Sequence, residues 1–297
     1  MSVLKQRFLL VSDMHYTTDE KKLDGAKVSA AAGPAFGKTQ REKVEKIYND
    51  IMRENEKSKL DAVFVLGDLS IDDYDFRNLP FNFCEKFKNE VMDRLPCPAY
   101  ALPGNHDSYT NEIWKSVMGY DRKYSLEIGD SAFIMDDSFS AVPANPKNPA
   151  SGSPFTPTDA AFLSDCLKKH AGKKIFLCSH YFNHSQKDLS LSEECRTLIE
   201  NSSDLLMMFC GHTHVNTVTS ALGKQLVDIG GYGYSGKFID GRYDFNIFDK
   251  AWAWGYQILE IYDDSVKTYH VTTDNTYFAT NGVFEIEKYV SDEIVLK

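Results

Sequence analysis

Side chains that can bind metal recur at the ends of five short apolar runs in this chain. The clearest case is Cys210-Gly211-His212-Thr213-His214, where two histidines stand one residue apart directly after an apolar run. Alone this pattern is weak evidence for a metal site, because it also occurs in polar turns. Four other apolar runs end in similar residues, namely Asp13-Met14-His15, Gly67-Asp68, Gly104-Asn105-His106-Asp107 and Ser179-His180. The repetition indicates one shared site.

These residues can meet although they are far apart in the chain. In open α/β sheets, ligands bind beyond the carboxyl ends of the strands, so polar residues at those ends converge. Five of the eight histidines fall in these turns, which unrelated strand ends would not produce. We therefore expect one site with seven metal ligands: Asp13, His15, Asp68, Asn105, His180, His212 and His214.

Seven ligands are more than the three or so protein ligands that one catalytic zinc ion uses. They suit two divalent metal ions per chain that share a bridging carboxylate. Imidazole mixed with carboxylate and amide favours Mn or Fe, with Zn as an alternative, over Mg or Ca. Two such ions carry four positive charges, whereas the two aspartates and a bridging hydroxide carry three negative ones. The pocket therefore keeps a positive charge, which suits a phosphate group.

In this order the five motifs resemble the calcineurin-like metallophosphoesterase superfamily, over residues 13–214, about two thirds of the chain. The resemblance implies an α/β fold, a four-layer α/β/β/α sandwich of two mixed sheets flanked by helices. It also implies a dinuclear centre. One ion would be bound by Asp13, His15, Asp68 and His214. The other would be bound by Asp68 as the bridge, Asn105, His180 and His212.

The resemblance further implies the reaction, which is in-line attack of a metal-bridging hydroxide on a phosphate ester. Asn105 and His106 would bind the substrate, and His106 would protonate the leaving oxygen as the general acid. Asp107 would orient His106. Two departures from the motifs of related branches of the superfamily bear on the substrate class. The turn after Asp68 lacks the arginine of Ser/Thr protein phosphatases, and His180-Tyr181-Phe182 replaces the His-x-Pro turn common in cyclic-nucleotide phosphodiesterases.

Three functions stay open at this point. The leading one is a metal-dependent phosphohydrolase that acts on a small phosphorylated substrate. The alternatives are a cyclic-nucleotide or other nucleotide phosphodiesterase, and a non-catalytic metal-binding interaction scaffold of the same fold. The complete ligand set and His106 favour an enzyme. Further residues near the motifs could bind substrate or merely pack around the site: Tyr16, Tyr109, Tyr181 and His184.

Composition excludes some partners and suggests a compartment. A formal net charge of −10 disfavours non-specific binding to nucleic acid or to an anionic membrane. The six cysteines contain no CxxC pair, which suggests a reducing compartment. The chain shows no signal-peptide pattern and no apolar segment long enough to span a bilayer. We expect a cytoplasmic protein, and its oligomeric state stays open.

The elements that must position the site follow an α/β order. Strands precede each motif, and a helix between residues 39 and 52 separates the first two strands, which predicts a parallel pair. Residues 16–38 form a long segment without periodicity, and Pro157 is expected at the first position of a helix. From about residue 215 the chain is β-rich, and we expect a second sheet there on the same core. With no linker or repeat, residues 1–297 are predicted to be a single domain.

Overall fold

The computed structural model describes residues 2–15, 40–69, 83–107, 109–140, 154–184, 189–214, 216–232, 238–239, 242–243, 255–272, 275–279, 282–286 and 293–297. The segment 16–38 lies outside these residues. In the part of the chain that is described, no helix combines the length and apolar character needed to cross a membrane.

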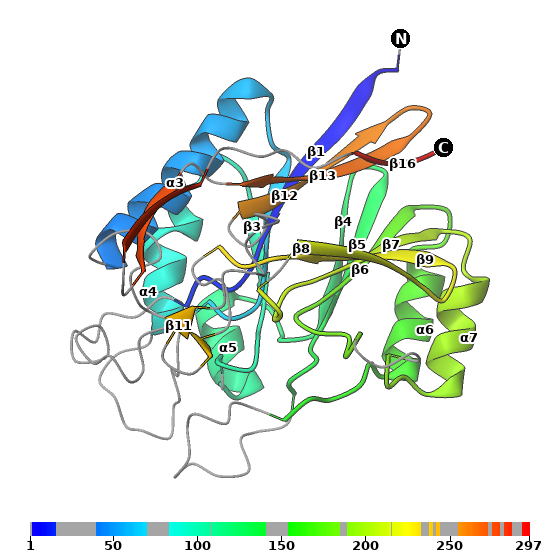
Figure 1. Ribbon diagram of the computed structural model, residues 1–297. Coiled ribbons are helices and arrows are strands. Elements are labelled where there is room, and N and C mark those ends of the chain that lie inside the picture. Colours follow the sequence, from blue (N-terminus) through cyan, green and yellow to red (C-terminus); the bar gives the residue numbers. More distant parts are fainter. Residues whose placement is uncertain are drawn as a thin grey trace.

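Two six-stranded mixed sheets form the centre of the fold (Figure 1). The first has the order β16-β13-β12-β1-β2-β3, with the bounds β1 (Leu4–Val11), β2 (Ala62–Leu66), β3 (Ala99–Leu102), β12 (Gly255–Tyr262), β13 (Val266–Thr272) and β16 (Ile294–Leu296). The second has the order β4-β5-β6-β7-β9-β8, with the bounds β4 (Tyr124–Ile128), β5 (Ser131–Asp136), β6 (Lys174–Ser179), β7 (Leu205–Cys210), β8 (Asn216–Ala221) and β9 (Lys224–Ile229). Two short hairpins complete the described strands: β10 (Phe238–Ile239) with β11 (Arg242–Tyr243), and β14 (Asn275–Ala279) with β15 (Gly282–Ile286).

Helices cover the outer face of each sheet (Figure 1). The first sheet carries α3 (Gln40–Lys57), α4 (Phe83–Glu90), the 3-10 turn η3 (Met92–Arg94) and α5 (Asn111–Met118). The second sheet carries α6 (Ala160–Lys169) and α7 (Glu193–Asn201). The expected four-layer α/β/β/α sandwich is confirmed, and β1, α3 and β2 form the expected parallel unit.

Strand alternation explains how one strand can serve two cores. Successive side chains of a strand point to opposite faces of its sheet. In β1, Leu9 and Val11 pack under the helices, whereas Phe8 and Leu10 pack between the two sheets. The ring of Phe8 lies 4.9 Å from that of Phe133 on β5, between ring centroids. Aromatic side chains thus join the two sheets at their centre.

The β-rich part of the chain only partly forms the expected second sheet on the same core. The strands β8 and β9 complete the second sheet, and β12, β13 and β16 extend the first. In particular, β12 pairs antiparallel with β1. For β12, β13 and β16 the prediction was wrong, because β1, the first strand of the chain, needs a partner on each side for its buried backbone groups. Periodicity identifies a strand but not the edge to which it adds.

The start of α6 also differs from the prediction. Asp159 is the N-cap, and its carboxylate accepts hydrogen bonds from the backbone N–H groups of Ala161 and Phe162. Pro157 therefore lies two residues before the cap instead of at the first helical position. The side-chain oxygen of Asp159 accepts two of the N–H groups that have no partner in the first turn of the helix. A proline has no side-chain acceptor and could not bind these groups.

A buried ion pair ties α3 to the first sheet. Arg7 is 3% exposed, and its Nη2 donates to Glu54 Oε2 at 2.6 Å. Its other nitrogens donate to the carbonyl oxygens of Glu54 and Ser58 and to Glu260 Oε1. All polar atoms of the guanidinium group are thus engaged with helix and sheet together.

We expect the variant Arg7→Met to lower the free energy of unfolding by about 3 kcal/mol. Glu54 would lose its buried cationic partner and keep only the half-exposed Lys57 and the hydroxyl of Tyr256 among its described contacts. Lys88→Met is the matched control, since the pair of Lys88 with Asp93 is exposed and should contribute only about 0–1 kcal/mol. Urea unfolding followed by circular dichroism measures both. Equal losses in the two variants would contradict the role assigned to Arg7.

Candidate metal centre

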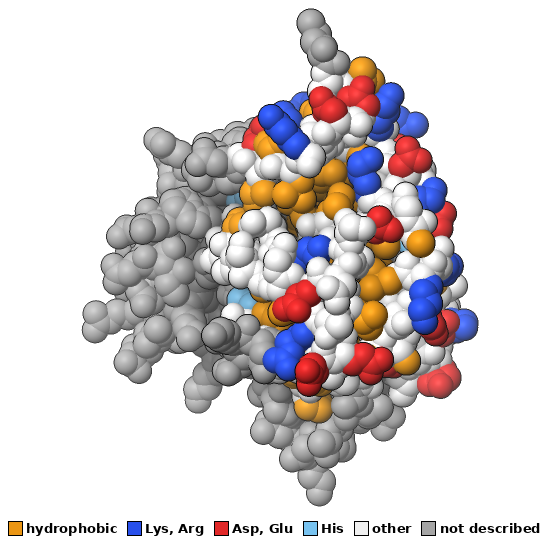
Figure 2. Space-filling view, turned by 90° about the vertical axis from the view of Figure 1, so that its right-hand side faces the viewer, with side chains coloured by type: hydrophobic (Ala, Val, Ile, Leu, Met, Phe, Trp, Pro, Cys, Tyr) orange, Lys and Arg blue, Asp and Glu red, His pale blue; other side chains and the backbone are white. Residues whose placement is uncertain are grey.

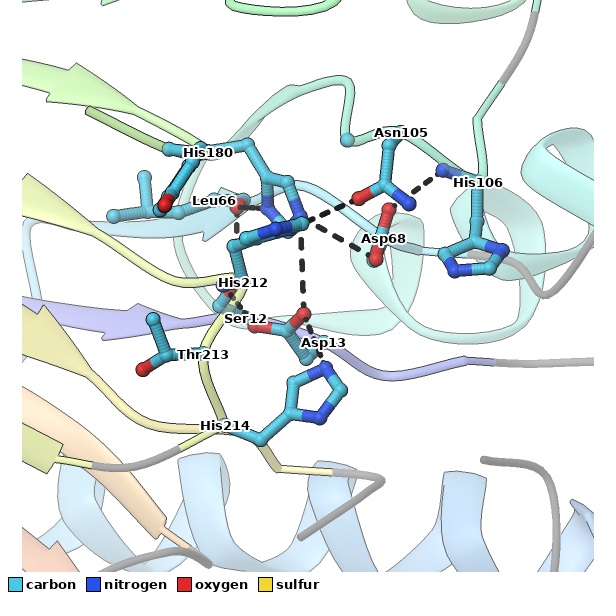
Figure 3. Close-up of polar contacts among 12 residues, drawn as sticks. Ser12, Asp13, Leu66, Asp68, Asn105, His106, His180, His212, Thr213 and His214 are labelled. Atoms are coloured by element: carbon cyan, nitrogen blue, oxygen red, sulfur yellow. Dashed lines mark hydrogen bonds and ion pairs between the residues drawn. The ribbon is translucent and has the colours of Figure 1, made fainter. Parts of the chain in front are cut away.

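The seven expected ligands meet where the two sheets present the carboxyl ends of β1, β2, β3, β6 and β7. Figure 3 labels all of them except His15. The first sheet supplies Asp13, His15, Asp68 and Asn105 from the turns after its strands. The second supplies His180, His212 and His214. The site is therefore built across the seam between the sheets.

Asp13 and Asp68 each divide their two oxygens between a neighbouring loop and the imidazoles. Asp13 Oδ2 accepts the backbone N–H of His212 at 3.0 Å, and Asp68 Oδ1 accepts that of His106 at 2.9 Å. The opposite oxygens, Asp13 Oδ1 and Asp68 Oδ2, face histidine side chains. Each carboxylate thus holds the loop of another motif and still presents one oxygen to a cation.

Four of the ligands form one compact group. Single ligand atoms of Asp13, His15, Asp68 and His214 all lie within 4.8 Å of one another. His214 Nε2 lies 3.1 Å from Asp13 Oδ1 and 3.3 Å from His15 Nε2. Imidazole nitrogens this close to a carboxylate oxygen are placed to share one ion. This group matches the ligands that the resemblance implies for the first ion.

The remaining ligands gather on the other side of Asp68. His180 Nε2 lies 3.3 Å from Asp68 Oδ2, and Asn105 Oδ1 lies 3.0 Å from His212 Nδ1. The rings of His180 and His212 are 5.2 Å apart between centroids. Since Asp68 Oδ2 is also 3.7 Å from His15 Nε2, this oxygen stands between the two groups, as a bridging ligand must.

A backbone carbonyl sets the orientation of His180. Its Nδ1 lies 2.7 Å from the carbonyl oxygen of Leu66, to which it donates. Nε2 is therefore the nitrogen that faces Asp68 and Asp13. Ligand histidines commonly use their second nitrogen in this way, which fixes the ring and the tautomer.

The charges of the site fit a cation. Burial opposes protonation of His180, but Asp68 and Asp13 outweigh it and raise its pKa to about 10. Burial likewise opposes ionisation of Asp13, but His214 and His180 hold its pKa at about 2. Without an ion, two buried carboxylates therefore keep a proton on an imidazole between them.

Unsatisfied atoms point to the same conclusion. Among the described residues, Asp13 Oδ1 and His180 Nε2 are buried and make no hydrogen bond of acceptable geometry, although His214 Nε2 lies 3.1 Å from Asp13 Oδ1. Buried polar atoms are normally satisfied. An ion in each ligand group would satisfy them, since Asp13 belongs to the first group and His180 to the second, and the imidazole, carboxylate and amide donors suit Mn, Fe or Zn. The residues fit two divalent ions.

Backbone strain is concentrated at the ligands. Nine non-glycine residues in the described part of the chain have positive φ, and five of them belong to this set. They are Asp13 at 56°, His15 at 45°, Asp68 at 50°, His212 at 75° and His214 at 61°. Each such conformation costs about 1 kcal/mol or more and persists only where the surroundings impose it.

Two glycines permit close approach between the motifs. A Cβ on Gly104 would lie 2.1 Å from Asp68 Oδ1, and one on Gly211 would lie 2.0 Å from Ser12 Oγ. Neither neighbour can move freely, because both belong to the loops that carry the ligand carboxylates. The glycines of the GNHD and GHTH motifs therefore serve packing around Asp13 and Asp68.

His106 and Asp107 directly follow the expected ligand Asn105 and lie next to the seven ligands. The half-buried ring of His106 is 5.2 Å from the ring of His15 between centroids. Asp107 is fully buried, and its Oδ2 accepts the backbone N–H groups of Leu69 at 3.0 Å and Gly104 at 2.9 Å. Asp107 thus joins the turn of Asp68 to the turn of Asn105, and its expected role in orienting His106 stays a prediction.

The sequence analysis did not identify Arg122 and Asp137, whose contacts hold the loop that follows His106. Arg122 is buried, and its Nη1 donates to the carbonyl oxygens of Asp107 and Tyr109. Its Nε and Nη2 donate to both carboxylate oxygens of Asp137. Asp137 follows an apolar run just as the other motif residues do, so the same rule could have found it. No sequence signal distinguishes Arg122.

An aromatic wall lines the His212 side of the site. The ring of Phe139 lies 5.7 Å from those of His180 and His212, and the ring of Tyr181 lies 4.3 Å from that of His212. Phe155 packs edge-on against Tyr181 at 5.6 Å. Phe155 and Tyr181 are half-buried, so part of each ring stays accessible.

The other substrate-binding candidates occupy different places. Tyr109 is 6% exposed in the core, with Oη accepting the backbone N–H of Cys84, which leaves little ring surface for a substrate. His184 is half-buried with its ring 5.5 Å from that of Tyr181. Tyr16 lies outside the described residues.

Comparisons with known proteins agree with this geometry. A family model described as calcineurin-like phosphoesterase matches residues 6–216. A dimetal phosphatase from Danio rerio is similar in structure over 97% of this chain and 99% of its own, with a TM-score of 0.62 and 12% identity. No curated protein sequence matches the chain significantly.

Two further solved structures share the fold. GAP50, named as the anchor in the inner membrane complex of Plasmodium, covers 99% of this chain and 90% of its own, with a TM-score of 0.56 and 14% identity. PhoD covers 99% and 70%, with a TM-score of 0.54 and 12% identity. At these identities the likeness shows the fold alone.

We expect Gly104→Ala to lower metal affinity and activity by about 10²-fold, since the new Cβ would displace Asp68 and small misplacements cost that much. Gly119→Asn is the control, because Gly119 ends α5 in open space at a left-handed position that asparagine tolerates. Metal content per folded chain measures the effect. A Gly104→Ala protein with full metal content would show that this contact is dispensable.

Proposed function

The chain belongs to the calcineurin-like phosphoesterase family, and from this premise we propose that it hydrolyses a phosphate ester of a small molecule with two divalent metal ions bound. One observation carries the proposal. Asp68 Oδ2 lies between His15 Nε2 and His180 Nε2, at 3.7 Å and 3.3 Å, while Oδ1 is held by the backbone of His106. A buried carboxylate so placed suits a bridge between two ions.

Each of the two ligand groups would bind one ion. Asp13, His15 and His214 would bind one ion with Asp68, and Asn105, His180 and His212 would bind the other with the same carboxylate. The ions are proposed to be Mn or Fe, with Zn as an alternative. When bound, such a pair supplies a water of lowered pKa and positive charge against the phosphate oxygens.

His106 is proposed as the general acid and as a contact of the substrate phosphate. Its backbone N–H donates to Asp68 Oδ1, which positions the residue beside the first ligand group, and its ring lies 5.2 Å from the ring of His15 between centroids. The ring is half-buried and therefore open to a bound substrate. The hydrogen bonds of Asp107 to the N–H groups of Leu69 and Gly104, and of Arg122 to the carbonyl of Asp107, limit the movement of this loop.

The aromatic wall supports a second candidate within the same chemistry. The accessible parts of Phe155 and Tyr181 beside His212 offer a surface on which a flat group could stack. This arrangement favours a nucleotide or aryl ester and keeps a nucleotide phosphodiesterase as the alternative. A non-catalytic scaffold has less support, because such a protein needs neither the complete ligand set nor His106.

A panel of phosphomonoesters and phosphodiesters, including p-nitrophenyl phosphate, bis-p-nitrophenyl phosphate and cyclic nucleotides, tests the proposal. We expect Mn²⁺-dependent hydrolysis of at least one class, and the preferred class separates the two candidates. A chain that binds two ions and hydrolyses none of these esters would support the scaffold.

Loss of the shared carboxylate should remove both ions. In Asp68→Ala we expect fewer than one ion per chain after loading with Mn²⁺, and no measurable turnover, because each group loses a ligand at once. Asp93→Ala, which removes an exposed carboxylate, should retain both ions and full activity. Metal analysis of the purified proteins decides, and an Asp68→Ala protein that keeps two ions would contradict the bridging role.

The leaving group tests the role of His106. General acid catalysis contributes about 10²–10⁴-fold, and a basic alkoxide needs it more than p-nitrophenolate. We expect His106→Ala to slow alkyl phosphate hydrolysis by that factor and p-nitrophenyl phosphate hydrolysis much less. Asn105→Ala should slow both alike, since it disturbs metal and phosphate binding. Equal losses on both substrates in His106→Ala would assign the proton to another group.

A further inference from the structure

A second group of potential metal ligands lies apart from the dinuclear set. One ligand atom each of His184, Cys210 and Asp228 lies within 4.8 Å of the other two. Asp228 Oδ2 is 3.6 Å from His184 Nε2, and Cys210 Sγ is 3.9 Å from His184 Nδ1. The three residues come from different elements, namely the loop after β6, the end of β7 and the end of β9.

Burial and charge make this group unusual. Cys210 is 0% exposed and Asp228 1%, whereas the side chain of His184 is 15% exposed. Asp228 accepts hydrogen bonds from the Thr213 hydroxyl and the Gly230 N–H. Within the described residues it forms no ion pair with lysine or arginine. A buried carboxylate is normally paired or binds a metal, and among the described residues His184 forms a close ion-pair contact with Asp228, with Nε2 3.6 Å from Oδ2.

The group does not share a ligand with the dinuclear set. Figure 3 shows the side chain of Thr213 turned away from the rings of His212 and His214. Its hydroxyl binds Asp228 on that other side. The segment after β7 therefore presents imidazoles to one site and contacts the second group with the residue between them.

We propose that His184, Cys210 and Asp228 form a third metal site that binds a single Zn²⁺ ion. Thiolate, imidazole and carboxylate are the ligands that zinc takes in proteins, and three protein ligands leave a fourth position for water. A thiolate disfavours Mg, Ca and Mn, so this site would select a different metal from the sulfur-free dinuclear set. The proton of Cys210 leaves to solvent as the ion binds.

The observed spacing is compatible with one ion. From the usual Zn–S, Zn–N and Zn–O lengths, ligand atoms around tetrahedral zinc lie about 3.3–3.6 Å apart. The separations of 3.6 Å from His184 Nε2 to Asp228 and 3.9 Å from His184 Nδ1 to Cys210 are close to this range, and one ligand atom of each residue lies within 4.8 Å of the other two. Only one nitrogen of His184 would bind, so its ring must turn slightly, which its half-buried loop position permits. The same partial exposure gives the ion a path from solvent.

Cobalt substitution tests the site independently of phosphoesterase activity. Co²⁺ bound to thiolate gives a near-ultraviolet charge-transfer band, and the dinuclear ligands contain no sulfur, so the band reports this site alone. We expect the band in the Co²⁺-loaded protein and its loss in Cys210→Ser. Cys178→Ser is the matched control, since Cys178 is equally buried on neighbouring β6 but outside the group, and it should retain the band.

A second measurement covers the case in which Cys210→Ser does not fold. His184→Gln changes a partly exposed loop residue, so the fold should persist, as circular dichroism can verify. We expect it to bind one Zn²⁺ fewer per chain, or to bind it more weakly by about 10–100-fold or more, in competition with a chromophoric chelator. Absence of the cobalt band in the wild-type protein, or a band and zinc content unchanged in both variants, would overturn the proposal, whatever the phosphoesterase assays show.

Discussion

The arrangement of the site depends on the two oxygens of each central aspartate having different partners. A carboxylate in a buried position must be compensated on both oxygens. In Asp13 and Asp68 one oxygen accepts a backbone N–H from a distant motif, and the other faces imidazoles. The same side chain therefore fixes the loop of another motif through a hydrogen bond and supplies the negative charge that attracts cations. Metal binding and local folding cannot be separated at these two residues.

This dependence explains why the site needs both sheets. The aspartates come from the first sheet and three of the imidazoles from the second, so the distance between the sheets decides whether the ligand atoms meet. The aromatic contacts between the sheets, such as Phe64 with Phe133 at 4.0 Å, hold that distance. Close-packed interiors are stiff, which is why a core far from the chemistry can keep ligand atoms in place.

The strain in the ligand turns is local, while the interactions that support it are spread over the fold. Five ligand residues adopt left-handed φ values. Asp107 binds the N–H groups of Leu69 and Gly104, beside Asp68 and Asn105. The carbonyl of Leu66 binds His180, and Arg122 binds the carbonyl of Asp107. These contacts do not touch the expected ions. They resemble the outer contacts that orient ligands in metal proteins generally, and they make the turns rigid without adding further charge to the centre.

The sequence by itself determined which residues could bind metal, because side-chain chemistry and position after an apolar run are local properties. His15, His180, His212 and His214 were found in this way, and the order of the motifs indicated the fold. Only the tertiary structure decided the rest. It alone brought Arg122 behind His106, gave Asp107 its two backbone partners, added β12 to the free edge of β1, and set Cys210 beside His184 and Asp228. These are contacts between distant segments, and their geometry depends on how whole sheets pack, which no local pattern of residues contains.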